Sequence, residues 1–161
     1  MNKQDVLNYL TAEGIHYSLH EHPAVYTCSE AEIHCKDIPG ISAKSLLVKA
    51  KDQFYLCLVP ANKKLDNKGL EAIVGVKKIR FATAEELMQL LKLTPGSVSP
   101  FGLINDVEHN VKLLIDESIS QSEYVQFHPN INTATLALTQ NEFQKFLDAI
   151  KVDAKVEKLT A

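Results

Sequence analysis

Residues 45–59, SLLVKAKDQFYLCLV, decide the fold of this 161-residue chain. Two apolar runs, at residues 45–50 and 53–59, are separated only by the polar pair Lys51-Asp52. Such runs on either side of a short polar turn are typical of a β-hairpin whose strands are drawn into the interior. We therefore expect this hairpin at the heart of a β-sheet.

The segments on either side of the hairpin alternate between helix and strand patterns. Helices are expected over residues 3–13, 29–36, 66–74 and 83–92 and from residue 139 onward, with capping-box spacing at Ser29/Glu32, Thr83/Glu86 and Thr139/Glu142. Strands are expected over residues 15–20, 78–82, 111–116, 124–127 and 133–138, and the last ten residues should hold a short strand and a frayed end. Because helices and strands are interspersed without a repeat or a linker, the sequence predicts an α/β fold, with one domain over residues 1–161.

The composition is that of an ordinary globular protein, with 45% hydrophobic and 23% charged residues. No apolar run approaches the roughly 20 residues of a membrane-spanning helix, and the first residues lack the apolar core of a signal peptide. The three cysteines, Cys28, Cys35 and Cys57, are odd in number and form no Cys-x-x-Cys pair. We therefore expect reduced thiols in a cytoplasmic protein that makes no contact with a membrane.

The charges are unevenly distributed along the chain. The net charge of −3 argues against indiscriminate binding of nucleic acid. Residues 36–80, however, hold ten Lys or Arg against four Asp or Glu, a local charge of +6 that leaves −9 for the remainder. This polarity favours a basic face that receives a polyanion, and it equally allows a solvated lysine surface.

A second distinctive stretch is LTPGSVSPFGLIND, residues 93–106, with two prolines and two glycines. Its composition suits neither a helix nor a plain strand, since Pro95 and Pro100 lack backbone donors while Gly96 and Gly102 can adopt positive φ. We expect a stiff loop whose exposed N–H groups cradle an anion or a developing oxyanion. The alternative is an ordinary connecting turn.

The common catalytic signatures are absent from the sequence, namely the Gly-x-Ser-x-Gly elbow, the Walker loop, the dinucleotide-binding fingerprint and His-Glu-x-x-His. His20 and His22 are spaced for one strand face, but no third ligand is evident, so we expect no metal and no cofactor. Two other residues remain candidates. Lys44, at the mouth of an apolar strand, is either a solvated end charge or a point charge for a phosphate. His128, held by Pro129, is either structural or functional.

Four segments occur in the order that one known family shows. They are HPAVYT at residues 22–27, AKSLLVK at 43–49, TPGSVSPFGLIND at 94–106 and FHPNINTATLALT at 127–139. With these motifs the chain resembles the YbaK/prolyl-tRNA synthetase editing-domain family, over roughly residues 3–150, and within it the free-standing alanyl-tRNA(Pro) deacylases. The resemblance implies a central mixed, partly closed β-sheet flanked by helices, with the substrate cleft beside the Gly-x-x-x-Pro loop.

The resemblance also implies an activity, the hydrolysis of the ester that joins alanine to the 3′ end of proline tRNA. Water would attack the ester with help from a ribose hydroxyl, without a cofactor. The implied partners are the tRNA(Pro) acceptor end carrying alanine and, transiently, prolyl-tRNA synthetase. Two alternatives stay open: a deacylase of Cys- or Ser-charged tRNA, and a non-catalytic module that binds aminoacyl-tRNA or a synthetase.

Matching motif to motif, the resemblance implies three central residues. Lys44 would anchor phosphate near the terminal adenosine, Gly96 would open the loop that holds the aminoacyl end, and His128 would position the ester. The further substrate-binding residues would be Ser97, Val98, Ser99, Pro100, Phe101, Gly102, Asn132, His22 and Thr27. One position departs from the family, because Ser45 follows Lys44 where Asn or Thr is frequent. We expect the backbone geometry set by Gly96 and Pro100 to matter more than the hydroxyls of Ser97 and Ser99.

Overall fold

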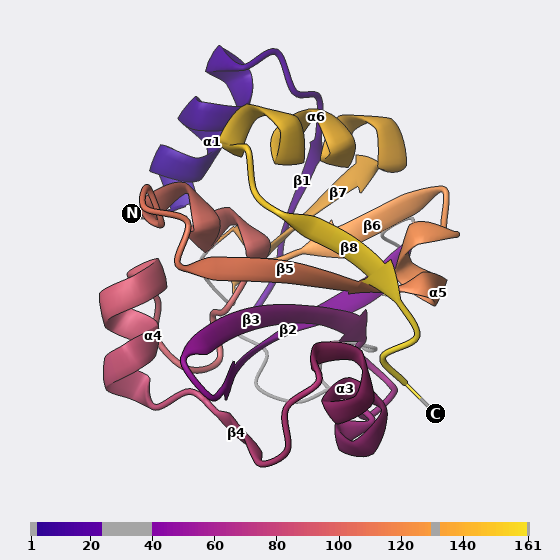
Figure 1. Cartoon of the computed structure of the whole chain (residues 1–161). Coiled ribbons are helices and arrows are strands. Elements are labelled where there is room, and N and C mark those ends of the chain that lie inside the picture. Colours follow the sequence, from indigo (N-terminus) through magenta and orange to yellow (C-terminus); the bar gives the residue numbers. More distant parts are fainter. Residues whose placement is uncertain (1–2, 24–39, 130–132, 161) are drawn as a thin grey trace.

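The computed structural model describes residues 3–23, 40–129 and 133–160 (Figure 1). The expected hairpin is present: β2 (Ile41–Ala50) and β3 (Gln53–Pro60) pair antiparallel from Ala43 opposite Pro60 to Ala50 opposite Gln53. Lys51 makes the reversal with φ of 59°, in the left-handed region. Because β2 begins at Ile41 and not at residue 45, Lys44 lies within the strand and not at its mouth.

The described strands form one mixed, eight-stranded sheet around this hairpin. Its order is β1 (Ser18–Glu21), β7 (Ala134–Thr139), β6 (Tyr124–Phe127), β2, β3, β5 (Val111–Asp116) and β8 (Ala154–Glu157). The remaining strand, β4 (Ile79–Phe81), pairs with β2. The free edge of β2 is thus divided between β6, which runs parallel to its first residues, and β4, which runs antiparallel to its last. The expected mixed α/β sheet is confirmed.

Helices cover both faces of the sheet (Figure 1). They are α1 (Lys3–Ala12), α3 (Asn67–Val74), α4 (Ala84–Leu91), the 3-10 helix η1 (Pro100–Asn105), α5 (Glu117–Ser120) and α6 (Gln140–Ile150). The larger core lies where α1, α4, η1 and α6 pack on one face, with Leu56 and Phe146 fully buried. The smaller core lies on the opposite face under α3, around Cys57 and Leu70.

Two of the predicted capping boxes have different outcomes. At α4 the box is complete, since the Thr83 side chain accepts from the Glu86 N–H and the Glu86 carboxylate accepts from the Thr83 N–H. At α6 only half of it forms, with Thr139 accepting from the Glu142 N–H. The Glu142 carboxylate instead accepts from the backbone N–H of His16, at 2.8 Å. A long-range contact has replaced the local one and fastens the segment before β1 to α6.

The structure corrects the prediction for three segments. Strand β1 is shifted, since it runs over Ser18–Glu21 and not over residues 15–20. The short helix α5 was not predicted; it begins where Asp116 accepts from the Ser118 N–H. The frayed C-terminal end was also wrong, because Leu159 and Thr160 are 0% and 5% exposed. The predicted helix over residues 29–36 lies outside the described residues.

The carboxylate of Asp116 joins three parts of the chain. Its side chain is buried at the end of β5 and accepts from the backbone N–H groups of Leu159 and Thr160, at 2.8 and 3.1 Å, as well as from Ser118. Burial raises the pKa of Asp116, but the hydrogen bonds from Ser118, Leu159 and Thr160 outweigh burial and hold that pKa below its ordinary value. The C-terminal residues are therefore ordered by a buried anion.

Replacement of Asp116 by alanine should lower the free energy of unfolding by about 3 kcal/mol, because buried N–H groups lose a charged acceptor. Asp153→Ala is the matched control, expected within about 0.5 kcal/mol of the parent, since that carboxylate is exposed and 4.0 Å from Lys112 Nζ. Urea unfolding measures both. The Asp116 contribution should be present above about pH 4, the ordinary aspartate pKa, and be lost as the pH falls through the lower folded-state pKa. Equal effects of the two substitutions would contradict this role.

Candidate functional site

Polar side chains line the sheet between β1 and β2, on the side opposite the larger core, and two of them, Gln126 and Thr135, are buried. Along β6 and β7 the residues Val125, Phe127 and Leu136 belong to the larger core, so the residues between them face the other way. The strand ladders pair His20 with Thr135 and Ser42 with Gln126. The side chains that share this polar face are Ser18, His20, Ser42, Lys44, Gln126 and Thr135.

His128 follows directly after β6 and is half-buried. Its Nδ1 lies 3.0 Å from the carbonyl oxygen of Ala134. A carbonyl oxygen only accepts, so Nδ1 carries the proton of this hydrogen bond. Burial lowers the pKa of His128 below its ordinary value; the hydrogen bond to Ala134 opposes this effect and the neighbouring His22 adds to it.

His22 is held in place beside His128 by three hydrogen bonds. Its backbone N–H donates to Thr133 O at 2.9 Å, its Nδ1 donates to Pro23 O at 2.8 Å, and its Nε2 lies 2.8 Å from Thr135 Oγ1. The ring centroids of His22 and His128 are 6.3 Å apart. Thr135 was not among the predicted site residues, although it lies in the segment at residues 127–139. Because it comes one residue before Leu136, which faces the larger core, strand alternation places Thr135 on the polar face.

Lys44 lies on the same polar face. Ser42 of β2 pairs with Gln126 of β6 in a parallel ladder, and Lys44 and His128 each follow two residues later. Side chains two residues apart along a strand leave the same face, so both point to this side of the sheet. Within the described part of the chain, the Lys44 ammonium has no hydrogen-bond or ion-pair partner, and so a ligand anion can pair with it.

The predicted loop has an exposed tip and a buried base. Gly96 lies at the tip with φ of 90°, and nothing lies within 4 Å of where a Cβ would be. The N–H of Ser97 closes a turn onto Thr94 O at 3.1 Å. At the base, Ser99 is 1% exposed and its hydroxyl accepts from the Phe101 N–H, which begins η1. The expectation that no helix suits this stretch was wrong, because this cap and the preset φ of Pro100 start a 3-10 turn.

Part of the loop expected at the substrate packs instead into the interior. Phe101 is fully buried, with its ring 6.0 Å from that of Phe127 and 5.2 Å from that of Phe146. Gly102 packs so tightly that an added Cβ would lie 2.6 Å from Leu93 Cδ1. Ser99, Pro100, Phe101 and Gly102 therefore support the loop from below. The Phe101–Phe127 contact fixes the base of the loop beside the residue that precedes His128.

Two predicted site residues, Thr27 and Asn132, lie outside the described residues. His22, Lys44 and His128 lie on the polar face, and Ser97 and Val98 lie half-buried between the tip and base of the loop. In the described ranges no three His, Cys, Asp or Glu side chains are grouped so as to hold a metal. Within the same ranges, no helix is both long and apolar enough to span a bilayer.

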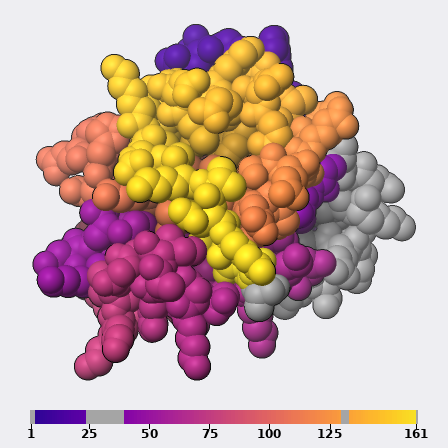
Figure 2. Space-filling model, turned by 45° about the vertical axis from the view of Figure 1, so that its right-hand side comes forward, coloured from indigo at the N-terminus to yellow at the C-terminus, as the bar shows by residue number. Residues whose placement is uncertain are grey.

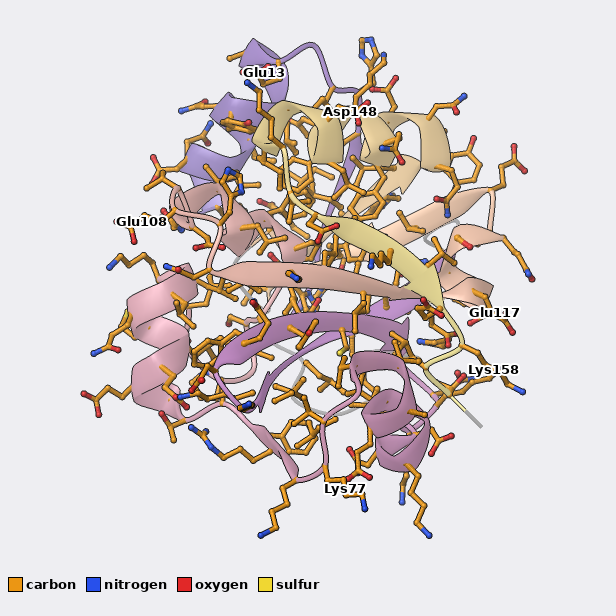
Figure 3. All side chains as sticks on the ribbon, viewed as in Figure 1. Glu13, Lys77, Glu108, Glu117, Asp148 and Lys158 are labelled. Atoms are coloured by element: carbon orange, nitrogen blue, oxygen red, sulfur yellow. The ribbon has the colours of Figure 1, made fainter. Side chains whose placement is uncertain are left out.

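A basic hollow of about 370 Å³ lies at the other end of β2 and is lined by Lys49, Lys51, Lys78, Ile79 and Arg80. Side chains of the α3–β4 region protrude from this lower end of the molecule, Lys77 among them (Figures 2 and 3). Glu86 pairs with Arg80 through two hydrogen bonds of 2.7 and 3.0 Å. The hydrogen bonds from Arg80 and from the Thr83 backbone lower the pKa of Glu86 to about 2. Lys51 and Lys78 have no such partner among the described residues, so they keep an unpaired positive charge.

The family model of the aminoacyl-tRNA editing domain matches residues 22–146. This chain belongs to that family. As an aminoacyl-tRNA editing domain it is a hydrolase of the aminoacyl ester, and the expected enzyme class is confirmed.

Curated relatives of this editing domain match it over most of its length. It is 37% identical over 149 residues to the prolyl-tRNA editing protein ProX of Acetoanaerobium sticklandii, covering 91% of each chain. It is 31% identical to prolyl-tRNA synthetase associated domain-containing protein 1 of Xenopus laevis, covering 90% of this chain and 89% of that protein. The proline–tRNA ligase of Bacillus subtilis matches 68% of this chain at 29% identity, which is 20% of the ligase.

A solved structure supports the fold of this editing domain. A crystal structure described as a candidate trans-editing enzyme for prolyl-tRNA synthetase aligns with a TM-score of 0.79 and 26% identity, covering 99% of this chain and 96% of that one. A second crystal structure, of the hypothetical protein APE2540, aligns with a TM-score of 0.76 at 20% identity and shows the fold alone.

Substitution of Gly96 by alanine should lower the rate of ester hydrolysis by about a hundredfold, because a residue with Cβ leaves φ of 90° and turns the loop N–H groups away. The space around Gly96 is open, so the fold should persist. Ser97→Ala is the matched control, expected within about twofold of the parent rate, since the neighbouring backbone is unchanged. Ser99→Ala should cost about 1 kcal/mol of stability through the lost cap. Ester loss from aminoacyl-tRNA is measured, and an equal defect in Ser97→Ala would refute the backbone account.

Proposed function

We propose that this chain is a trans-editing hydrolase that removes alanine from mischarged tRNA(Pro), and that residues 1–161 form one editing domain that acts in the cytoplasm. The names of its relatives support tRNA(Pro) as the substrate class. The observation that carries the proposal is the shared polar face: Lys44, which has no partner among the described residues, and half-buried His128 lie on one side of the sheet. The base of the Gly96 loop packs through Phe101 against Phe127, the residue before His128.

The proposed hydrolysis needs no side-chain nucleophile. An aminoacyl ester is already an activated acyl group, so positioned water can attack it without a protein nucleophile. The carbonyl oxygen gains negative charge in that step and needs donors, each worth about 2.7–4 kcal/mol in comparable sites. The Ser97 N–H is committed to Thr94 O. The N–H groups of Gly96 and Val98 have no partner among the described residues and are the donors we assign to the oxyanion.

The other two residues hold the tRNA end. The ammonium of Lys44, unpaired among the described residues, suits a phosphate near the terminal adenosine, as a point charge on a strand paired at both edges. His128 lies on the same face and is proposed to position the ester. A small pocket admits alanine and excludes the larger proline ring, which makes the reaction a second sieve after the synthetase. We also propose transient contact with prolyl-tRNA synthetase.

Purified protein incubated with Ala-, Cys-, Ser- and Pro-tRNA(Pro) should release alanine fastest and leave Pro-tRNA(Pro) at the buffer rate, because proline is sterically excluded. Lys44→Ala should lower alanine release by about tenfold, the loss of one charge-assisted contact, without changing thermal unfolding. Alanine loss no faster than in buffer would overturn the proposal. Faster loss of cysteine or serine would reassign the amino acid, and binding without ester loss would identify a non-catalytic module.

The acceptor stem is assigned to the basic hollow at the end of β2. Lys44 and Lys49 are five residues apart on one strand, about 16 Å at 3.3 Å per residue. Side chains five residues apart leave opposite faces of a strand, so a phosphate backbone that runs from Lys44 along β2 must cross to the other face near the hairpin turn to reach Lys49, Lys51 and Lys78. The acidic remainder of the chain would repel the tRNA elsewhere and favour this orientation.

Simultaneous Lys51→Gln and Lys78→Gln should weaken binding of tRNA(Pro) and reduce the slope of log affinity against log salt by about 2, one for each lost phosphate contact. The paired control is Lys155→Gln with Lys158→Gln, which removes the same charge beside β8 and should leave the slope unchanged. Binding measured across a salt series gives both slopes. Equal slopes for the two double variants would show that only net charge matters.

A further inference from the structure

The histidine pair offers one ring nitrogen that the fold leaves for a ligand. Both ring nitrogens of His22 are engaged within the chain, Nδ1 with Pro23 O and Nε2 with Thr135 Oγ1, each at 2.8 Å. His128 uses Nδ1 for Ala134 O at 3.0 Å. Nε2 of His128 has no hydrogen-bond partner among the described residues, although the ring is half-buried. A half-buried polar atom without a partner among the described residues can receive one from a ligand.

The bond that His128 makes decides what Nε2 can do. Because the Ala134 carbonyl only accepts, the ring hydrogen of a neutral His128 is on Nδ1. Nε2 then carries a lone pair and accepts a hydrogen bond. The partner must therefore be a donor.

The surroundings keep this ring uncharged. The groups that face it from the neighbouring strands are His20 and His22 of the β1 side, Lys44 of β2, Gln126 of β6 and Thr135 of β7. None of these described groups is a carboxylate that would stabilise an imidazolium. Burial lowers the pKa of His128 and the nearby His22 lowers it further. At neutral pH the Nε2 lone pair is available.

We infer that Nε2 of His128 accepts a hydrogen bond from a neutral hydroxyl group at the reacting end of the substrate, and that His22, whose ring centroid lies 6.3 Å away, is the positioning residue beside it. This inference rests on the proposed function for its substrate. The hydroxyl comes from the terminal ribose or from the attacking water. The α-ammonium of the alanyl group fits less well, because this face carries Lys44 and no described carboxylate.

Long-range ¹H–¹⁵N correlation of the histidine rings in the free protein at pH 7 tests the protonation state of His128 and the role of His22. His128 should show a protonated Nδ1 and an unprotonated Nε2. His22→Ala should move the titration of His128 to higher pH, since both burial and a like charge are reduced. His20→Ala is the matched control; His20 lies on the same face but bonds Ser18, so the titration should not move. A proton on Nε2, or no shift in His22→Ala, would overturn the inference.

Binding and rate measurements test which hydroxyl group donates to Nε2 of His128. The probes are acceptor-stem RNA hairpins that carry alanine through an amide, one with a terminal ribose and one with a 2′-deoxyribose. If the ribose is the donor, His128→Ala should weaken binding of the ribose probe alone by about fivefold to tenfold. If water is the donor, both probes should bind both proteins equally, and His128→Ala should lower only the rate of ester hydrolysis. No effect on either binding or rate would refute the role of His128.

The two proposals fail in different ways. The ring titration is read in the free protein and needs no substrate, so it stands even if another aminoacyl-tRNA is the one hydrolysed. If another aminoacyl ester is hydrolysed faster than the alanyl ester, the amide-linked probes should carry that amino acid in place of alanine. Such a result would not affect the protonation state of the His128 ring measured in the free protein.

Discussion

Strand β2 is the constraint on which the rest of the molecule depends. It pairs with β3 along its length, with β6 at its first residues and with β4 at its last. A strand held by ladders on both edges cannot slide, because a shift of one residue would turn every side chain to the opposite face. Lys44 therefore stays on the polar face and Ala43 in the larger core. The same strand sets the separation between the proposed ester site and the basic hollow.

The site combines a rigid base with an exposed tip. Ser99, Phe101 and Gly102 are buried under the loop, and Phe101 packs on the residue before His128. In the proposed reaction this packing would aim the backbone donors, and an ester that is already activated would need no side-chain nucleophile. Family membership shows the type of reaction, and the proposed roles of the polar face are compatible with it.

The features that could be predicted from the sequence are those determined by residues close together in the chain. The hairpin at Lys51, the Thr83 capping box and the strands β5 and β6 depend on local patterns, and they formed as expected. Features that depend on distant partners could not be predicted. Glu142 has left its capping box for the backbone of His16, far away in sequence. Thr135 became part of the site only because β1 brings His22 against β7.

The position of β1 at the edge of the sheet has a consequence for how long the site stays assembled. Among the described strands β1 pairs only with β7, and His22 follows directly after it. Edge strands exchange their amide hydrogens through local openings that need less free energy than global unfolding. Each such opening would carry His22 away from His128 and leave the rest of the sheet intact. The bond from Glu142 to His16 and the buried face of α1 oppose this opening. With the proposed role of His22, the fraction of molecules competent for hydrolysis at any moment would be set by the local stability of the N-terminal strand, and not by the stability of the whole fold.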